Sequence, residues 1–148
     1  MQTYHAINNV QGYLRSKLLD NSAWLRVLPR GMIPGDMDFV IDNDGNLLFA
    51  EIKEGNEWEV ANWDHVGYGQ RRVYESIVRA GRGRQTAVLC LVERPPQGTM
   101  IDTLKDVFSF QVMTYQDGEP VVQPARPGPE WLAFVQGWMV ETTTTTLS

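Results

Sequence analysis

The chain has 148 residues and a formal net charge of −5 at pH 7, with 43% hydrophobic and 21% charged residues. These proportions are typical of a soluble globular protein, and the length suits one domain with a sizeable core. No apolar run is long enough to span a membrane and no charged-then-apolar leader opens the chain, so we expect a cytoplasmic protein. The single Cys90 excludes an internal disulfide, and no cysteine–histidine spacing fits a zinc site.

The first predicted elements are a helix over residues 3–20 and a strand over 23–28. Apolar residues recur at helical spacing between Ile7 and Leu18, and Trp24 is the expected buried anchor of the strand. The body of the helix has no aspartate or glutamate, and His5 is its most notable polar residue. The body of this helix therefore offers no acidic ligand.

Two strands joined by a tight turn are predicted between Gly35 and Lys53. The pair Asp44-Gly45 favours a two-residue hairpin turn, in which both positions have a positive φ. That turn fixes the register, which pairs Asn43 with Asn46, Ile41 with Leu48, Phe39 with Ala50 and Met37 with Ile52. Because side chains alternate along a strand, the last three pairs share one apolar face, which we expect to be a core face.

The opposite face of the same hairpin is predicted to hold an acidic site. The register places Asp38 across from Glu51, and Lys53 projects from the same face two residues further on. Two opposed carboxylates repel each other and lower stability, unless a cation lies between them. Carboxylate oxygens suit Mg²⁺ or Mn²⁺, so the pattern predicts a metal site. Asp36 is an alternative as a ligand, as a group behind the ligands or simply as a strand-start residue, and it would face Lys53 and pair with it.

A second helix is predicted from Asp64 or His65 to about residue 80, followed by a strand over residues 86–92. The expected inner stripe of this helix is Val66, Val73, Ile77 and Ala80. Gln70 and Tyr74, four residues apart, share one face. The strand is an unbroken apolar run, as expected for a strand that is buried on both faces and parallel to its neighbour.

The last third of the chain is predicted to add a strand over 108–115, an Asp117-Gly118 turn, a short strand near Val121 and a helix over 127–140. The aromatic stripe of that helix predicts packing on the sheet or a contact between copies in a homo-oligomer. The threonine-rich segment that follows has low complexity. We therefore expect a single domain over residues 1–141 and a flexible tail over 142–148.

Three spaced motifs resemble the PD-(D/E)xK nuclease superfamily and its RecB-like branch. They are G-x-x-D at Gly35–Asp38, E-x-K at Glu51–Lys53 and Q-x-x-x-Y at Gln70–Tyr74. The resemblance covers residues 23–92. It implies an α/β, restriction-endonuclease-like core of order α-β-β-β-α-β, with a mixed central sheet flanked by helices. The C-terminal β and α elements would be an extension of that core.

The resemblance implies metal-dependent hydrolysis of DNA phosphodiester bonds. Its metal ligands would be Asp38, Glu51 and the main-chain carbonyl of Ile52, which together would hold Mg²⁺ or Mn²⁺. Lys53 would orient the nucleophile or offset charge, and Gln70 would position the water or the DNA backbone. An acid that the family often carries on its first helix is missing here. His5 is one candidate for that ligand, and a surface or capping histidine is the alternative.

Nucleic-acid contacts are predicted from a group of cations after the acidic centre. Arg71, Arg72, Tyr74, Arg82 and Arg84 are the predicted contacts, and Arg79 lies in the same basic cluster. The alternative is a solvated helix face, and the net negative charge argues against a nucleic-acid partner. Trp58 and Trp63 lie beside the site, where they would either stack on bases or close the core.

Several functions agree with these motifs. A RecB-like exonuclease and a small structure-selective endonuclease both fit. The alternative is an inactive protein with the nuclease fold, and the missing acid of the first helix favours it. Such a protein would bind nucleic acid, or would bind a nuclease or defence complex. The last possibility is an interaction domain whose match to the nuclease motifs is a coincidence. Small proteins of the resembled kind are associated with phages and mobile elements, which implies such an origin.

Overall fold

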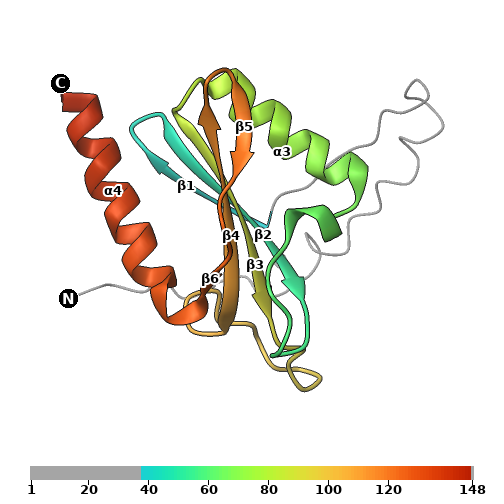
Figure 1. Ribbon diagram of the computed structural model, residues 1–148. Helices are drawn as coiled ribbons and strands as arrows, with labels where there is room; N and C mark the ends of the chain where they lie inside the picture. The colour runs from blue at the N-terminus through green and yellow to red at the C-terminus, as the bar shows by residue number, and fades with distance from the viewer. Residues whose placement is uncertain (1–37, 148) are drawn as a thin grey trace. The chain divides into compact units, whose positions relative to one another are not determined.

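A mixed sheet of six strands and two α-helices form an α/β fold in the computed structural model, which describes residues 38–147 (Figure 1). The described residues belong to one compact unit of the chain. The strands are β1 (Phe39–Asn43), β2 (Asn46–Glu54), β3 (Gln85–Val92), β4 (Val107–Gln116), β5 (Glu119–Val122) and β6 (Arg126–Pro127). The helices are α3 (Tyr68–Gly81) and α4 (Trp131–Leu147), preceded by the short 3-10 helices η1 (Trp63–His65) and η2 (Gly128–Glu130). The predicted helix over 3–20, the strand over 23–28 and the pairing of Met37 lie outside the described residues.

The predicted hairpin is confirmed in the antiparallel pair of β1 and β2. Its register pairs Phe39 with Ala50, Ile41 with Leu48 and Asn43 with Asn46. Asp44 and Gly45 form the turn with φ values of 54° and 86°. Both positions therefore adopt the left-handed conformation that a two-residue turn of this kind requires.

The strand order in the sheet is β1-β2-β3-β4-β5, with β6 paired to β4. β2 and β3 are parallel because α3 carries the chain from the end of one strand back to the start of the next. The other neighbours are antiparallel, and Asp117-Gly118 forms the predicted turn between β4 and β5 with φ values of 51° and 86°. β6 was not predicted, because its two residues form a strand only through pairing with distant β4.

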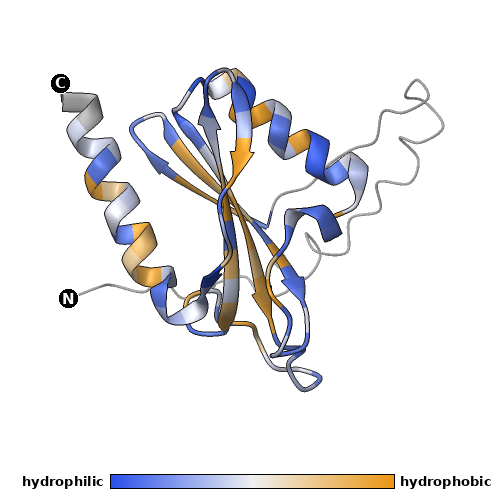
Figure 2. Ribbon diagram, viewed as in Figure 1, coloured by the Kyte–Doolittle hydropathy of each residue, from blue (hydrophilic) through white to orange (hydrophobic). Residues whose placement is uncertain are grey.

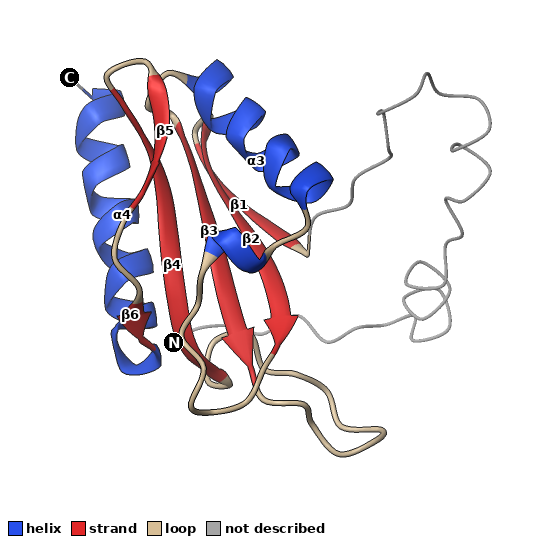
Figure 3. Ribbon diagram, turned by 45° about the vertical axis from the view of Figure 1, so that its right-hand side comes forward, coloured by secondary structure: helices blue, strands red, loops and turns tan. Residues whose placement is uncertain are grey.

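The two helices cover opposite faces of the sheet (Figure 3). Successive residues of β3 pack alternately into two cores, as predicted for a strand buried on both faces. Ala87, Leu89 and Leu91 lie in the core under α3, whereas Val88, Cys90 and Val92 lie in the core with Trp131 and Trp138 of α4. Figure 2 shows this apolar centre, with hydrophilic residues over the outer surface of α3.

The inner face of α3 differs from the predicted stripe. Its buried residues are Tyr74 and Val78, and Ile77 packs only partly against the core, while Ala80 is exposed. Val66 is buried, but in the segment that precedes the helix. The buried positions are therefore shifted by about one residue from the expected stripe, and one of them is a tyrosine whose hydroxyl bonds Glu51.

α4 extends beyond the predicted end at residue 140. Trp131 and Trp138 are buried as expected, whereas Leu132 and Met139 are largely exposed. The helix continues through the threonines, and the hydroxyls of Thr142, Thr143 and Thr144 donate to carbonyls four residues back, as Thr142 does to Trp138 at 2.7 Å. Residues 142–147 therefore lie in α4 rather than after it. Within the part of the chain that the structure describes, no helix has the length and apolar character needed to cross a membrane.

Candidate active site

A buried carboxylate on β2 is the centre of the candidate site. Glu51 lies on the α3 face of the sheet, and 4% of its surface is exposed. Tyr74 donates a hydrogen bond from its hydroxyl to Oε2 at 2.6 Å, and Gln70 donates from Nε2 to Oε1 at 2.5 Å. The Lys53 ammonium lies 3.3 Å from Oε1. The i, i+4 pair on α3 and the E-x-K pattern on β2 therefore meet at one carboxylate.

Asp38 lies next to this group, immediately before β1. The last pair of the hairpin joins Phe39 to Ala50, so the same register places Asp38 beside Glu51. Oδ2 of Asp38 accepts a hydrogen bond from the main-chain N–H of Ile52 at 2.6 Å. In a strand, the N–H and C=O of one residue point to the same side. The carbonyl of Ile52 therefore lies on the Asp38 side of β2.

The charge balance at Glu51 favours a proton or a cation. Burial is the largest influence and raises the pKa of Glu51 above its ordinary value. The hydrogen bond from Tyr74 opposes this by lowering the pKa, the nearby charge of Asp38 raises it, and Lys53 lowers it. The net effect is a raised pKa, so the ionised carboxylate is less favourable here than in water.

We compare the free energies of unfolding of Glu51→Gln and wild type without metal. As the pH rises, we expect the difference between them to shift in favour of the variant. A raised pKa in the folded state gives stability that is present below the unfolded pKa and lost as the pH rises through the folded value. Glutamine does not titrate, so it avoids that loss. The measurement is the free energy of unfolding by chemical denaturation, from about pH 4.5 to neutral pH. Glu54→Gln, at an exposed position, is the control. A difference from wild type that shrinks with rising pH would contradict the expectation.

Tyr74 is held by a second layer of contacts. Its ring centroid lies 5.2 Å from that of Trp63, which is fully buried. Trp63 in turn donates from its main-chain N to Oε1 of Gln111 at 2.7 Å, and from Nε1 to the Gln111 carbonyl at 3.0 Å. The tyrosine is 1% exposed and its hydroxyl is bonded to Glu51, so the predicted contact with nucleic acid would require this side chain to leave the core. Trp63 closes the core, whereas Trp58 is 77% exposed.

Tyr74→Phe is expected to lower the free energy of unfolding by about 1.5–3 kcal/mol, because it removes a hydrogen bond to a buried carboxylate. The ring and its packing on Trp63 stay, so the change isolates the hydroxyl. Tyr68→Phe is the matched control, since Tyr68 is 76% exposed, and should change stability by less than about 0.5 kcal/mol. If the two variants change the free energy of unfolding equally in urea denaturation, the hydrogen bond from the Tyr74 hydroxyl does not stabilise the site.

Two arginines of the predicted basic cluster are paired with carboxylates of the chain. Arg71 contacts Asp64 and also bonds Glu75 at 3.0 Å. Arg79 bonds Glu119 on β5 at 3.1 Å. These ion pairs neutralise part of the positive charge that was expected to meet phosphate.

The other arginines are distributed around the ends of α3. Arg84 donates to the Asp44 carbonyl at 3.1 Å and so supports the hairpin turn. Arg72 lies over the ring of Tyr68, with 5.5 Å to the centroid. Arg82 is exposed at the C-cap of the helix, with a φ of 49°. Arg72 and Arg82 are therefore the arginines of the cluster best placed for an outside partner.

The metal donors are few within residues 38–147. No group of three or more histidine, cysteine, aspartate or glutamate side chains there could hold an ion. The register and the hydrogen bond to Ile52 place Asp38 next to Glu51 and on the same side of β2 as the Ile52 carbonyl, and His5 lies outside the described residues. A set of oxygen donors is suited to Mg²⁺ or Mn²⁺ rather than to softer metals.

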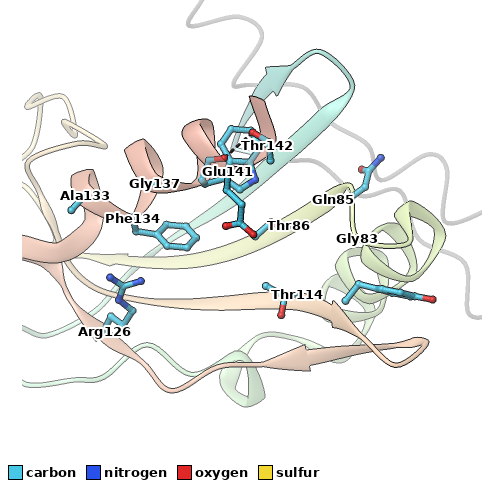
Figure 4. Close-up of a pocket in the computed structure, with 12 residues that line it drawn as sticks. Gly83, Gln85, Thr86, Thr114, Arg126, Ala133, Phe134, Gly137, Glu141 and Thr142 are labelled. Atoms are coloured by element: carbon cyan, nitrogen blue, oxygen red, sulfur yellow. Dashed lines mark hydrogen bonds between the residues drawn. The ribbon is translucent and has the colours of Figure 1, made fainter. Parts of the chain in front are cut away.

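A separate hollow of about 570 Å³ lies on the other face of the sheet, between α4 and strands β3 and β4 (Figure 4). Phe134 and Trp138 line it from the helix, and Thr86 and Thr114 from the strands. Glu51 lies on the α3 face, so this hollow is not part of the candidate site. Comparison of the chain with protein-family models, with curated proteins and with solved structures finds no match in any of the three.

Proposed function

We propose that the chain is a divalent-metal-dependent nuclease of the PD-(D/E)xK type that hydrolyses DNA phosphodiester bonds, with a restriction-endonuclease-like core. The observation that supports this most is the meeting of Asp38, Glu51 and Lys53 on one face of the hairpin. Gln70 reaches the same carboxylate from α3. A buried acid of raised pKa in a group of this kind is typical of functional sites.

The oxygens of the site are compatible with a bound divalent ion. Asp38, Glu51 and the carbonyl of Ile52 would hold it. Each carboxylate oxygen has two lone pairs, so the donors that already bond Glu51 do not use all of its capacity. A bound Mg²⁺ would supply charge to polarise a phosphate and to lower the pKa of a water.

The remaining polar groups have separate roles in this proposal. The side chain of Lys53 is 44% exposed, so its ammonium can reach a phosphate while it stays beside Glu51. It would offset the negative charge that develops in the transition state. The amide nitrogen of Gln70 is used on Glu51, which leaves its carbonyl oxygen to accept a hydrogen bond from the attacking water.

A cleavage assay tests this function. The purified protein is incubated with linear duplex, circular single-stranded and branched DNA, each with Mg²⁺ or Mn²⁺. Wild type should cleave at least one substrate, Asp38→Ala should not, and Glu54→Ala should cleave like wild type because Glu54 is exposed at the end of β2. The preferred substrate would distinguish an exonuclease from a structure-selective endonuclease. No cleavage by folded wild type, with no metal binding in calorimetry, would overturn the proposal.

A second candidate is a binding protein that keeps this arrangement without catalysis. The absence of a third acidic ligand among the described residues favours it, as do the internal ion pairs of Arg71 and Arg79. Such a protein would bind nucleic acid, or a nuclease or defence complex, without cleaving DNA. The same assay separates the two candidates, because only the nuclease loses an activity on substitution of Asp38.

A further inference from the structure

An exposed tryptophan stands on the segment between β2 and η1. Trp58 is 77% exposed, and Val60, two residues later, is 63% exposed. Exposed tryptophan is uncommon on soluble proteins, and tryptophan is enriched among the residues that dominate binding energy at interfaces. Its position outside the core therefore suggests a binding role.

The segment that carries Trp58 is fixed at both ends. The main-chain N–H of Gly55 donates to the Val92 carbonyl at 2.9 Å, and that of Ala61 donates to the Ser109 hydroxyl at 2.9 Å. Between them, the main-chain N–H of Glu59 closes a turn on the Asn56 carbonyl at 2.8 Å. A side chain presented from an ordered segment loses less entropy when it binds a partner.

Hollows flank the indole on two sides. One, of about 630 Å³, is lined by Trp58 and Val60 together with residues around η1, and the other, of about 350 Å³, is lined by Trp58 and residues that follow β2 and β3. The charged residues that line the two hollows are mostly acidic. They are Glu57, Glu59, Glu93 and Asp64, the last of which is paired with Arg71, against Arg94, which is paired with Glu54. We call the two hollows, with Trp58 between them, the Trp58 surface.

We propose that the Trp58 surface docks a basic segment of a partner protein, with an arginine or lysine of that segment placed over the indole ring. Tryptophan is the aromatic side chain that attracts such cations most strongly. Val60 adds apolar contact, and the exposed carboxylates of Glu57 and Glu93 complement the remaining positive charges. The same carboxylates repel phosphate, which disfavours nucleic acid as the occupant.

This docking does not depend on the nuclease site. Trp58 makes none of the hydrogen bonds to Glu51, and the proposal requires no metal. A negative result in the nuclease assay would therefore not contradict the docking proposal. A negative result in the docking test would likewise not contradict the proposed nuclease activity.

Calorimetric titration with three probes tests the proposal in metal-free, low-salt buffer. The probes are a short peptide of alternating arginine and glycine, the same peptide with glutamate in place of arginine, and an oligothymidylate. We expect the arginine peptide alone to bind. Trp58→Ala should weaken that binding about tenfold, and Trp58→Phe should restore part of it. Tyr68→Ala is the control, because it removes a ring of similar exposure over which Arg72 already lies. It should change the affinity for the arginine peptide less than twofold.

The charge component is tested by the double substitution of Glu57→Gln and Glu93→Gln, which should also weaken the arginine peptide. Circular dichroism establishes that each variant is folded. Equal affinity of wild type and Trp58→Ala for the arginine peptide would overturn the proposal, because it would indicate general attraction to an acidic protein. Binding of oligothymidylate without the peptide would overturn it in favour of base stacking. No binding of any probe would also overturn it.

Discussion

Replacement of Lys53 by methionine is expected to reduce the rate of DNA cleavage by at least about 10²-fold to 10³-fold while metal binding persists. The side chain keeps its length and loses its charge, which the proposal uses to offset charge in the transition state. Asp38 and Glu51 stay in place, so calorimetry should still detect Mg²⁺ or Mn²⁺. The two readouts separate a group that acts on the substrate from one that holds the ion.

Lys105→Met provides the matched control for this substitution. Lys105 is an exposed lysine in the segment before β4, and its replacement should leave the cleavage rate within about twofold of wild type. If Lys53→Met cleaves as fast as Lys105→Met, the ammonium beside Glu51 has no part in the reaction. Loss of metal binding along with cleavage would instead assign Lys53 to the assembly of the site.

Replacement of Trp63 by alanine is expected to remove about 3–5 kcal/mol of the free energy of unfolding. The indole is fully buried, packs on Tyr74 and donates to the Gln111 carbonyl, so alanine leaves a cavity and an unpaired acceptor. That loss is a large part of the stability of a typical domain. Chemical denaturation at neutral pH measures it.

The control is Trp58→Ala, because it deletes the same side chain where it is 77% exposed. We expect that variant to unfold within about 0.5 kcal/mol of wild type. Comparable losses in the two variants would mean that burial of Trp63 is not what stabilises the α3 face. Trp63→Phe, which keeps an aromatic ring against Tyr74, should lie between the two.

The parts of the fold that sequence predicted best are those that depend on local chemistry. The Asp44-Gly45 pair fixes a turn, and that turn fixes the hairpin register from Asn43 to Phe39. β3 was recognisable because both of its faces are buried, which requires an unbroken apolar run. The proximity of Asp38 and Glu51 followed from that register alone.

Other features depend on contacts between distant residues, which a local pattern does not contain. The period of α3 did not reveal that Tyr74 points at the sheet, because the partner that satisfies its hydroxyl is Glu51 on another element. The pairing of Arg79 with Glu119 joins α3 to β5 in the same way. The sequence therefore predicted the cations but not which of them the fold would neutralise.

The order of the strands in the sheet also has a consequence for how the chain folds. From β1 to β5, each strand pairs with the strand that follows it in the sequence. The β1–β2 and β4–β5 pairings close two-residue turns, whereas β3 and β4 are joined by residues 93–106 and the longer connection between β2 and β3 contains α3. The parallel β2–β3 pair joins residues far apart in the sequence, so we expect it to form later than the two hairpins. Glu51 therefore takes its place under α3 only when this crossover closes, whereas the hairpin that brings it beside Asp38 can form earlier.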